Sequence, residues 1–224
     1  MSNIYLLNLN NLELYDDYKK LVSNRCIEKA EKFQLIDDAK RTIGAELIVR
    51  YLLKKIYGYS NSEIEFEYNK YGKPYLKNGC DFFFNISHSG SWIACGVSNH
   101  EIGIDIEEIK DIDLKIANHF FSRGEQKYIF QTSIDRNRRF MIIWCLRECY
   151  TKQLGKGLLI PMDSYEIVIQ RKDYKVNSLL CNRVVYLKKT EQIENYILSE
   201  CNEDNSEIDL NILNISEIIE EIFD

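Results

Sequence analysis

The sequence predicts an α+β protein, because its helical and strand-like segments are grouped along the chain and do not alternate one by one. Two helical segments precede a run of strand patterns that ends near residue 100, and helices from residue 113 to residue 154 precede a second run. Grouped elements of this kind favour two similar halves over a repeat of strand–helix–strand units. At 224 residues with 45% hydrophobic side chains, the chain can bury a full core.

The first half combines helical spacing with alternating strand patterns. Apolar residues recur at helical spacing between residues 14 and 22, and a longer helical pattern from residue 38 to residue 57 stops at Gly58. The period then changes to the alternation that is typical of strands. The expected strands are residues 64–68, 82–87, 92–97 and 102–107, with a turn at residues 71–74.

The second half repeats this order with longer helices. Ser122 and Glu125 have the spacing of a capping box and predict the start of a helix, and a longer helix is expected from residue 135 to residue 155. Further strands are expected at residues 165–169, 184–187, 196–198 and 210–213, with a short helix after Ser216. Since no linker is visible, we expect the halves to be residues 1–101 and 102–224.

No segment of the sequence is typical of a targeting signal or a membrane span. The apolar run at residues 4–9 is too short for a signal peptide and lacks its basic flank. The 7 cysteines are scattered and never spaced as C-x-x-C, so they indicate reduced thiols and neither a disulfide framework nor a zinc site. We therefore expect a cytoplasmic protein that does not associate with membranes.

The net charge of -6 hides a basic region. Between Arg123 and Lys156, basic side chains outnumber acidic ones, which indicates phosphate or an acidic protein as partner more than duplex nucleic acid. A solvated helix surface would have the same composition and is the alternative. We expect a monomer that does not bind nucleic acid.

The most informative segment is Gly-Ile-Asp-Ile-Glu at residues 103–107. In a strand, alternate side chains share one face about 6 to 7 Å apart, so Asp105 and Glu107 lie together on the solvent-facing side and the isoleucines on the other. Two neighbouring carboxylates repel unless a cation lies between them, and hard oxygen ligands suit Mg²⁺. The alternative is a half-buried strand whose wet face is acidic without further meaning.

A second set of chemical groups is expected on the long helix. Trp144, Glu148 and Lys152 are spaced at i, i+4 and i+8 and so form one stripe, with Glu148 placed for an ion pair with Lys152. If this stripe faces the strand carboxylates, Glu148 completes a three-carboxylate cation site and Lys152 reaches a phosphate bound to the cation. A surface Glu–Lys pair beside a core tryptophan is the alternative.

Small polar residues at the end of an expected strand are candidate phosphate ligands. Residues 84–90, Phe-Asn-Ile-Ser-His-Ser-Gly, bring the hydroxyl of Ser87 and the imidazole of His88 to a turn, although a purely structural turn would look the same. Lys73 and Lys156 each lie on a glycine-containing loop. The Walker A loop, the G-x-G-x-x-G loop, the G-x-S-x-G elbow and the kinase motifs are absent.

Taken in order, these segments resemble a known family. The sequence contains F-N-I-S-H-S-G, G-I-D-I-E, F-F-S-x-x-E and W-x-x-(K/R)-E-x-x-x-K followed by G-K-G-L. This ordered set resembles the 4'-phosphopantetheinyl transferase superfamily, in its longer, surfactin-synthetase-activating group. The resemblance runs from about Arg41 to Ser164, with a weaker match at residues 28–33. It implies two pseudo-twofold-related α/β halves with coenzyme A and Mg²⁺, or Mn²⁺ in its place, in the cleft between them.

The resemblance also implies a role for each matching position. Asp105, Glu107 and Glu148 correspond to the magnesium ligands, and Glu148 also to the base that activates the acceptor serine. Lys152 and His88 correspond to residues that neutralise charge on the phosphates. The positions expected to contact coenzyme A are Lys29, Arg41, Thr42, Lys73, Pro74, Ser87, His88, Arg147, Lys152 and Lys156.

Two positions depart from the family pattern. Arg147 stands where lysine is usual, which keeps the charge but presents a planar fork to phosphate. Cys26 stands where a basic contact to the 3'-phosphate is expected, and the neighbouring Arg25 is a candidate substitute.

The predicted activity is transfer of 4'-phosphopantetheine from coenzyme A to a serine of an apo acyl or peptidyl carrier protein, with release of 3',5'-ADP. In this chemistry the metal bridges the pyrophosphate oxygens and Glu148 accepts the serine proton. Two alternatives stay open. Another Mg²⁺-dependent phosphotransferase or nuclease would turn over without coenzyme A, and a carrier-binding protein that kept the fold would not turn over at all.

Overall fold

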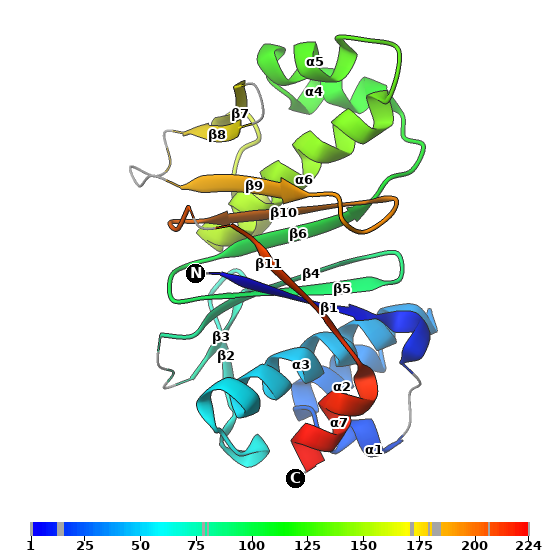
Figure 1. Cartoon of the computed structure of the whole chain (residues 1–224), viewed down its shortest axis with the longest axis vertical. Coiled ribbons are helices and arrows are strands. Elements are labelled where there is room, and N and C mark those ends of the chain that lie inside the picture. Colours follow the sequence, from blue (N-terminus) through cyan, green and yellow to red (C-terminus); the bar gives the residue numbers. More distant parts are fainter. Residues whose placement is uncertain are drawn as a thin grey trace.

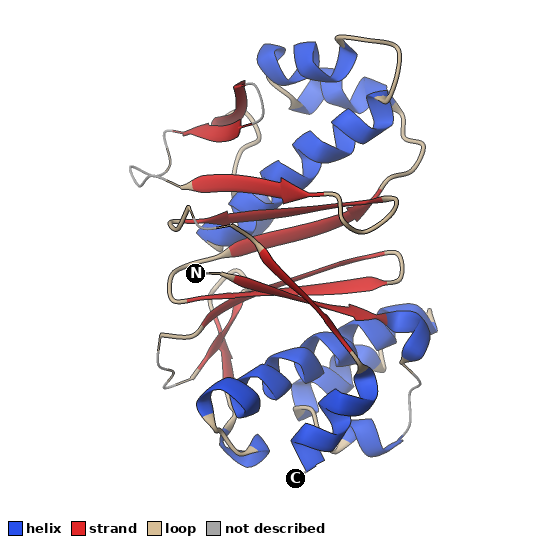
Figure 2. Cartoon of the chain, viewed as in Figure 1, coloured by secondary structure: helices blue, strands red, loops and turns tan. Residues whose placement is uncertain are grey.

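Two sheets lie between two layers of helices in the computed structural model (Figure 1; Figure 2). The structure describes residues 2–12, 16–77, 79, 81–170, 173–178, 180, 185–205 and 207–223. Helices α1, α2, α3 and α7 cover the outer side of one sheet, and helices α4, α5 and α6 lie beyond the other. The predicted α+β fold of two similar halves is therefore confirmed. Within the described ranges, no helix has the length and apolar character needed to cross a membrane.

The helices end where local sequence signals predict. Helix α3 stops at Gly58, α5 begins with the Ser122–Glu125 capping box, and α6 stops at Gly155. The α-helices are α1 Asp16–Lys19, α2 Asn24–Ala30, α3 Ile36–Tyr57, α4 Ala117–Phe120, α5 Arg123–Phe130, α6 Arg136–Leu154 and α7 Ile215–Phe223. Short 3-10 helices cover Leu9–Asn11, Asn61–Glu63, Leu114–Ile116 and Gly157–Leu159.

The strands form two larger sheets and one small hairpin. The strand orders are β11-β1-β5-β4 and β6-β10-β9-β8-β7, with β2-β3 as the hairpin. The strands are β1 Asn3–Asn8, β2 Phe66–Tyr68, β3 Pro74–Leu76, β4 Phe83–Ser89, β5 Trp92–Ser98, β6 Gly103–Glu108, β7 Tyr165–Gln170, β8 Asp173–Ser178, β9 Tyr186–Thr190, β10 Tyr196–Asn202 and β11 Asp209–Leu213. Edge strands β4 and β6 thus face each other where the two sheets meet.

Three strands were not expected from the sequence. Strand β1 lies in the apolar run near the start of the chain, β3 begins at Pro74 in the expected turn, and β8 has only Tyr174 and Val176 in alternation with polar side chains. The expected strand at residues 184–187 begins at Tyr186, and Val184 lies outside the described residues, as do Leu14, Cys80 and Cys181.

The end of the chain returns to the first half. Strand β11 pairs in parallel with β1, and three isoleucines of α7 are buried in the same apolar cluster as α3. The division of the chain after residue 101 stays a prediction. A separate apolar cluster, which contains Ile4, Leu6, Ile104, Ile106 and Leu198, joins the two sheets. The isoleucines of β6 therefore face the interface between the halves.

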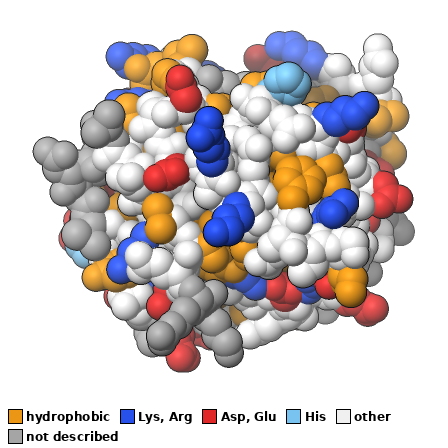
Figure 3. All heavy atoms as spheres, turned by 90° about the horizontal axis from the view of Figure 1, so that it is seen from above, with side chains coloured by type: hydrophobic (Ala, Val, Ile, Leu, Met, Phe, Trp, Pro, Cys, Tyr) orange, Lys and Arg blue, Asp and Glu red, His pale blue; other side chains and the backbone are white. Residues whose placement is uncertain are grey.

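The surface above α4 and α5 is mixed in character. Seen from this end, hydrophobic side chains lie among Lys and Arg side chains (Figure 3). Arg123 and Lys127 of α5 are exposed, and Phe120 of α4 is 49% exposed. Part of the basic region predicted between residues 123 and 156 therefore lies beside exposed apolar groups.

Candidate active site

A row of side-chain hydrogen bonds joins β4 to β6. Asn85 accepts from the backbone nitrogen of Ile104 at 2.9 Å, and Ser87 donates to Asp105 at 2.8 Å. Ser89 donates to Glu107 at 2.9 Å. Alternate side chains of β4 thus replace the backbone ladder that two neighbouring strands would otherwise share. The carboxylates of β6 are held at the junction of the two halves.

Asp105 is the most buried of these carboxylates, with 3% of its surface exposed. The ammonium of Lys152 lies 2.7 Å from its Oδ1 atom and also donates to the Ser87 hydroxyl at 2.8 Å. Within the described residues, its Oδ2 atom is buried and has no hydrogen-bond partner. A buried carboxylate oxygen without a donor is unusual and marks a position that suits a cation.

Glu107 is oriented from two sides. Its Oε2 atom accepts from Ser89, and its Oε1 atom accepts from the indole nitrogen of Trp144 at 3.2 Å. Burial, together with the charge of Asp105, raises the pKa of Glu107 above its usual range. The carboxylate is therefore fixed in direction, while burial and the nearby negative charge disfavour its ionised form.

Glu148 approaches the same place from α6, which packs closely on β6. A Cβ atom at Gly103 would lie 1.8 Å from the carbonyl oxygen of Cys149, so only glycine allows this contact. Burial and the charge of Asp105 raise the pKa of Glu148. In the described part of the chain, no hydrogen bond reaches its carboxylate. Glu148 is thus the least constrained of the three acids.

The donor set fits Mg²⁺ in its chemistry. The charge of Asp105 raises the pKa of Glu107 and of Glu148, and the charge of Glu107 also raises that of Glu148. Among the residues that the structure describes, no three such side chains are gathered into a metal-binding arrangement. Burial opposes the charge of Lys152, but attraction by Asp105 and Glu148 raises its pKa, so its ammonium offsets part of the negative charge of the three carboxylates.

A pocket of about 360 Å³ lies on the other side of β4. Five of the predicted coenzyme A contacts line it: Lys29, Arg41, Thr42, Pro74 and His88. Arg25 and Cys26 also line it, so the structure places the candidate substitute Arg25 in the same pocket. The pocket therefore combines positive charge with aromatic walls, which is a combination that suits a nucleotide.

Tyr68 and Glu46 line this pocket but were missed in the sequence. The guanidinium of Arg25 lies 3.7 Å from the centre of the Tyr68 ring, which holds the arginine over an aromatic face. Glu46 accepts from Ser23 and from Arg50, so its charge is already paired. The aromatic alternation of β2 was the only signal for Tyr68, and it equally predicts core packing.

His88 and Arg41 stand at the side of the pocket nearest the carboxylates. The imidazole is exposed at the pocket rim, yet surrounding protein atoms and the positive charges of Lys152, Arg41 and Lys29 lower its pKa. Arg41 pairs with Asp38 at 2.7 Å and donates to the Gly90 carbonyl at 2.7 Å. Neutral His88 is therefore the main form at neutral pH.

Lys73 does not extend into this pocket with its neighbour Pro74. Its ammonium lies 2.8 Å from Glu101 and donates to the carbonyls of Ile102 and Gln153. The β2–β3 turn is thereby attached to the end of α6. Lys156 lies exposed just after the same helix.

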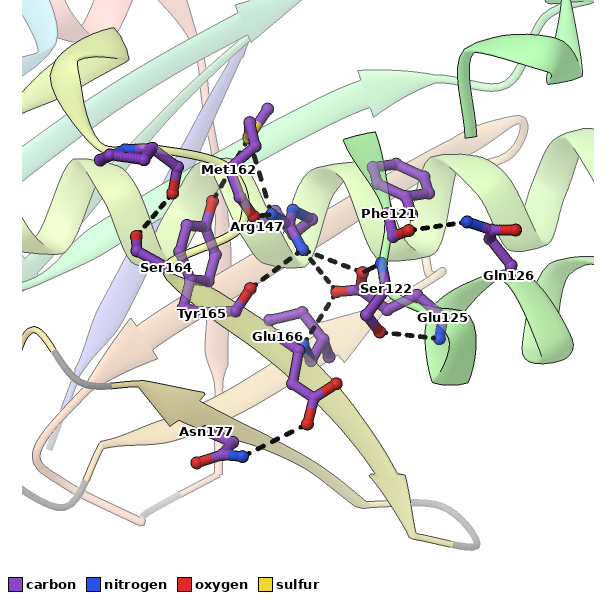
Figure 4. Close-up of polar contacts among 12 residues, drawn as sticks. Phe121, Ser122, Glu125, Gln126, Arg147, Met162, Ser164, Tyr165, Glu166 and Asn177 are labelled. Atoms are coloured by element: carbon purple, nitrogen blue, oxygen red, sulfur yellow. Dashed lines mark hydrogen bonds and ion pairs between the residues drawn. The ribbon is translucent and has the colours of Figure 1, made fainter. Parts of the chain in front are cut away.

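Arg147 contacts Glu125 and Met162 in the second half (Figure 4), and it does not line the cationic pocket. It is fully buried, and one guanidinium nitrogen lies 2.7 and 2.9 Å from the two oxygens of Glu125. It also donates to the Met162 carbonyl, while Glu125 accepts from the backbone nitrogens of Ser122 and Ile167. The expectation that Arg147 binds phosphate finds no exposed guanidinium to support it, because Glu125 and the Met162 carbonyl accept from its two terminal nitrogens.

A larger pocket lies elsewhere. It measures about 590 Å³ and lies between residues 119–122, 162–166 and 177–178 of the second half. None of the predicted site residues lines it. Volume alone therefore does not identify the candidate site, and the convergence of charged groups on β4 and β6 does.

Comparison with known sequences defines the class of protein. The family described as "4'-phosphopantetheinyl transferase superfamily" matches residues 101–201, and the family "4'-phosphopantetheinyl transferase, N-terminal" matches residues 14–100. In structure, the chain overlaps the holo-[acyl-carrier-protein] synthase of Thermotoga maritima over 45% of its own length and 61% of that chain, with a TM-score of 0.40 and 15% identity.

Two bacterial relatives extend the match over most of the chain. The 4'-phosphopantetheinyl transferase gsp of Aneurinibacillus migulanus is 38% identical over 86% of this chain and 82% of its own. The 4'-phosphopantetheinyl transferase Sfp of Bacillus subtilis is 34% identical over 82% of this chain and 83% of its own. The chain therefore belongs to the 4'-phosphopantetheinyl transferase superfamily, in the group of gsp and Sfp, and is an enzyme of that class.

Proposed function

We propose that this chain transfers 4'-phosphopantetheine from coenzyme A to the hydroxyl of a serine in an apo acyl or peptidyl carrier protein, with release of 3',5'-ADP. The position of β4 carries the proposal, because this strand separates the cationic pocket from the carboxylates of β6. His88 lines the pocket, whereas its neighbour Ser87 bonds to Asp105 on the other side. A nucleotide in the pocket would then have its phosphates beside the carboxylates.

The pocket suits the 3'-phosphorylated adenosine of coenzyme A. Lys29, Arg25 and Arg41 supply positive charge for phosphate groups, while Tyr68 and Pro74 provide flat apolar walls for a base. Arg25 provides the basic contact to the 3'-phosphate that the buried thiol of Cys26 does not provide. Lys73 supports this site indirectly, through its contacts with the end of α6. We assign Lys156 as a phosphate contact at the outer edge of the site. Arg147 is left out of the binding set.

The transfer forms one bond and breaks one. The serine oxygen of the carrier attacks the phosphorus that bears pantetheine, and the bond from that phosphorus to the oxygen of 3',5'-ADP breaks. Glu148 accepts the serine proton, since no hydrogen bond within the described residues occupies its carboxylate. Lys152 and His88 neutralise charge on the phosphate oxygens.

We assign Asp105, Glu107 and Glu148 as the residues that would hold Mg²⁺ or Mn²⁺. The unpartnered Oδ2 atom of Asp105 and the all-oxygen donor set support this assignment. When bound, such an ion supplies positive charge to the pyrophosphate and the leaving oxygen.

We further propose that the enzyme acts as a cytoplasmic monomer that binds neither nucleic acid nor membranes. The surface above α4 and α5, where hydrophobic and basic side chains lie together with some acidic ones, supports a protein partner (Figure 3).

Intact-mass spectrometry tests this function directly. Apo carriers from peptide, polyketide and fatty-acid systems are incubated with the protein, coenzyme A and Mg²⁺, and a mass increase of one phosphopantetheine is expected on at least one carrier. Carriers with the acceptor serine changed to alanine serve as the control. Turnover of phosphate esters without coenzyme A would favour the phosphotransferase or nuclease alternative, and carrier binding without any mass change would favour a non-catalytic protein.

A further inference from the structure

Ser89 lies at the junction of the two halves and contacts Glu107 directly. Its hydroxyl donates to Oε2 of Glu107 at 2.9 Å and accepts from the backbone nitrogen of Glu108 at 3.1 Å. The residue is 9% exposed. Because the hydroxyl uses its donor and an acceptor at once, its direction is fixed.

The two oxygens of Glu107 are held by two different elements. Ser89 of β4 binds Oε2, and Trp144 of α6 binds Oε1 at 3.2 Å. A carboxylate has about four acceptor positions, so each oxygen keeps one free after accepting a single hydrogen bond. Glu107 is therefore fixed in orientation and can still bind a cation.

The turn that carries Ser89 is held from both halves. The carbonyl of Gly90 accepts from Arg41 of α3 at 2.7 Å, and the backbone nitrogen of Ser91 donates to the Tyr196 hydroxyl of β10 at 3.2 Å. Gly90 has a φ of 53°, and a Cβ atom there would lie 2.1 Å from the Tyr196 hydroxyl. These contacts therefore fix the position of the Ser89 backbone relative to β6.

We propose that Ser89 is a positioning residue, which orients the Glu107 carboxylate for binding of the divalent cation. This inference rests on the proposed function, in which Glu107 is a metal ligand. Hydrogen bonds to a metal ligand orient it, and their loss typically costs about 10- to 100-fold in metal affinity. Ser89 acts through Glu107 and does not line the cationic pocket, in contrast to His88.

Direct metal binding tests the proposal without relying on turnover. Mn²⁺ is titrated into the full chain in the presence of 3',5'-ADP, with free Mn²⁺ measured by electron paramagnetic resonance. Ser89→Ala is expected to weaken Mn²⁺ binding about 10- to 100-fold. Ser89→Thr keeps the hydroxyl and should bind Mn²⁺ nearly as well as the wild type. Ser89→Cys keeps the volume with a weak donor and replaces the alanine variant if that variant does not fold.

Ser98→Ala is the matched control. Ser98 is 3% exposed, and its hydroxyl accepts from the backbone nitrogen of His100 at 3.2 Å at the end of β5. The Ser98→Ala variant therefore removes a buried hydroxyl from the same sheet, at a position that does not contact the carboxylates of β6. Its Mn²⁺ affinity should equal that of the wild type, whatever happens to the unfolding temperature.

A double-variant cycle separates positioning from a general loss of structure. If Ser89 acts through Glu107, then Ser89→Ala adds nothing to the loss of Mn²⁺ affinity in a Glu107→Gln background. An equal loss in both backgrounds, or wild-type affinity in Ser89→Ala, would overturn the inference and leave the proposed function standing. A wild-type protein that binds no divalent cation would overturn the metal site of the proposed function, and this inference with it.

Discussion

The ammonium of Lys152 lies 2.7 Å from Oδ1 of Asp105, so a residue of α6 neutralises the carboxylate that is buried most deeply between the two halves. The alternation of residues 103–107 predicts a solvent-facing side for Asp105, and this detail is wrong, since only 3% of the residue is exposed. Helix α6 and strand β4 cover that side, and no local pattern encodes these contacts. Removing Asp105 therefore affects stability as well as metal binding.

Asp105→Ala is expected to abolish transfer and to destabilise the fold. The Lys152 ammonium, whose side chain is 28% exposed, loses its anionic partner, and the Ser87 hydroxyl loses an acceptor. An unsatisfied group of this kind costs about 1–3 kcal/mol of unfolding free energy. Urea denaturation and the intact-mass assay measure the two effects. Asp105→Asn is the control for packing, and full transfer by the alanine variant at ordinary Mg²⁺ would remove the metal-site assignment.

Coenzyme A binding should become tighter as pH falls, because of His88. Surrounding protein atoms and neighbouring cations lower the pKa of the free imidazole, whereas a bound phosphate raises it. Binding of coenzyme A therefore takes up a proton. The affinity for coenzyme A rises as pH falls below the pKa of His88 in the complex, and it becomes constant below the pKa of His88 in the free protein. Calorimetric dissociation constants from pH 8.5 to pH 6 measure the slope.

His88→Gln is the control for this pH dependence, because the phosphate groups of coenzyme A titrate in the same range. The variant should lose the part of the slope that His88 contributes and should raise the KM for coenzyme A more than it lowers kcat. An unchanged slope in the glutamine variant, or a collapse of kcat at constant KM, would contradict the assignment of His88 as a phosphate contact.

Arg147 should contribute to stability and not to coenzyme A affinity. Its replacement by alanine leaves the buried carboxylate of Glu125 without its cation, which typically costs about 3–5 kcal/mol. Chemical denaturation should show this loss, and Arg147→Met combined with Glu125→Gln should restore part of it. A large rise in the KM for coenzyme A in a variant that is still folded would instead support the phosphate contact expected from the sequence.

The comparison of Arg147 with Glu148 shows what the sequence can predict. The order of motifs along the chain predicts that residues of β4, β6 and α6 form one site, and hydrophobic periodicity predicts which side chains of each element share a face. Neither signal shows which partner each of two neighbouring helix residues contacts. Arg147 meets Glu125, whose position depends on how α5 packs on α6, and the parallel pairing of β1 with β11 joins segments about 200 residues apart.

Gly103→Ala should lower transfer by displacing α6 from β6. The added Cβ atom would lie 1.8 Å from the carbonyl oxygen of Cys149 and 2.5 Å from the backbone nitrogen of Gln153, and neither backbone atom can turn away. Overpacking of this kind costs about 1–3 kcal/mol and would move Glu148 and Lys152 relative to β6. Gly124→Ala is the control, since its nearest contact would be an ordinary 3.7 Å. Wild-type kcat in Gly103→Ala would show that the contact does not position the site.

Glu148→Gln decides between two roles for the least constrained acid of the site. Glutamine keeps the size and offers one neutral oxygen to a cation, but it does not accept the proton of the carrier serine. If Glu148 is the general base, kcat should fall by roughly 10²- to 10⁴-fold while coenzyme A binding changes little.

A role of Glu148 in metal binding alone predicts a different response to the ion. The rate of the glutamine variant would then recover when Mg²⁺ is raised or Mn²⁺ replaces it, because a weakened site fills at higher concentration. The measurement is the single-turnover rate of Glu148→Gln across a metal titration, with Glu107→Gln as the comparison. Glu107 is tied to Ser89 and Trp144, so its variant should recover with metal. Recovery of the Glu148 variant to near the wild-type rate would exclude the base assignment and leave the three carboxylates as a metal site.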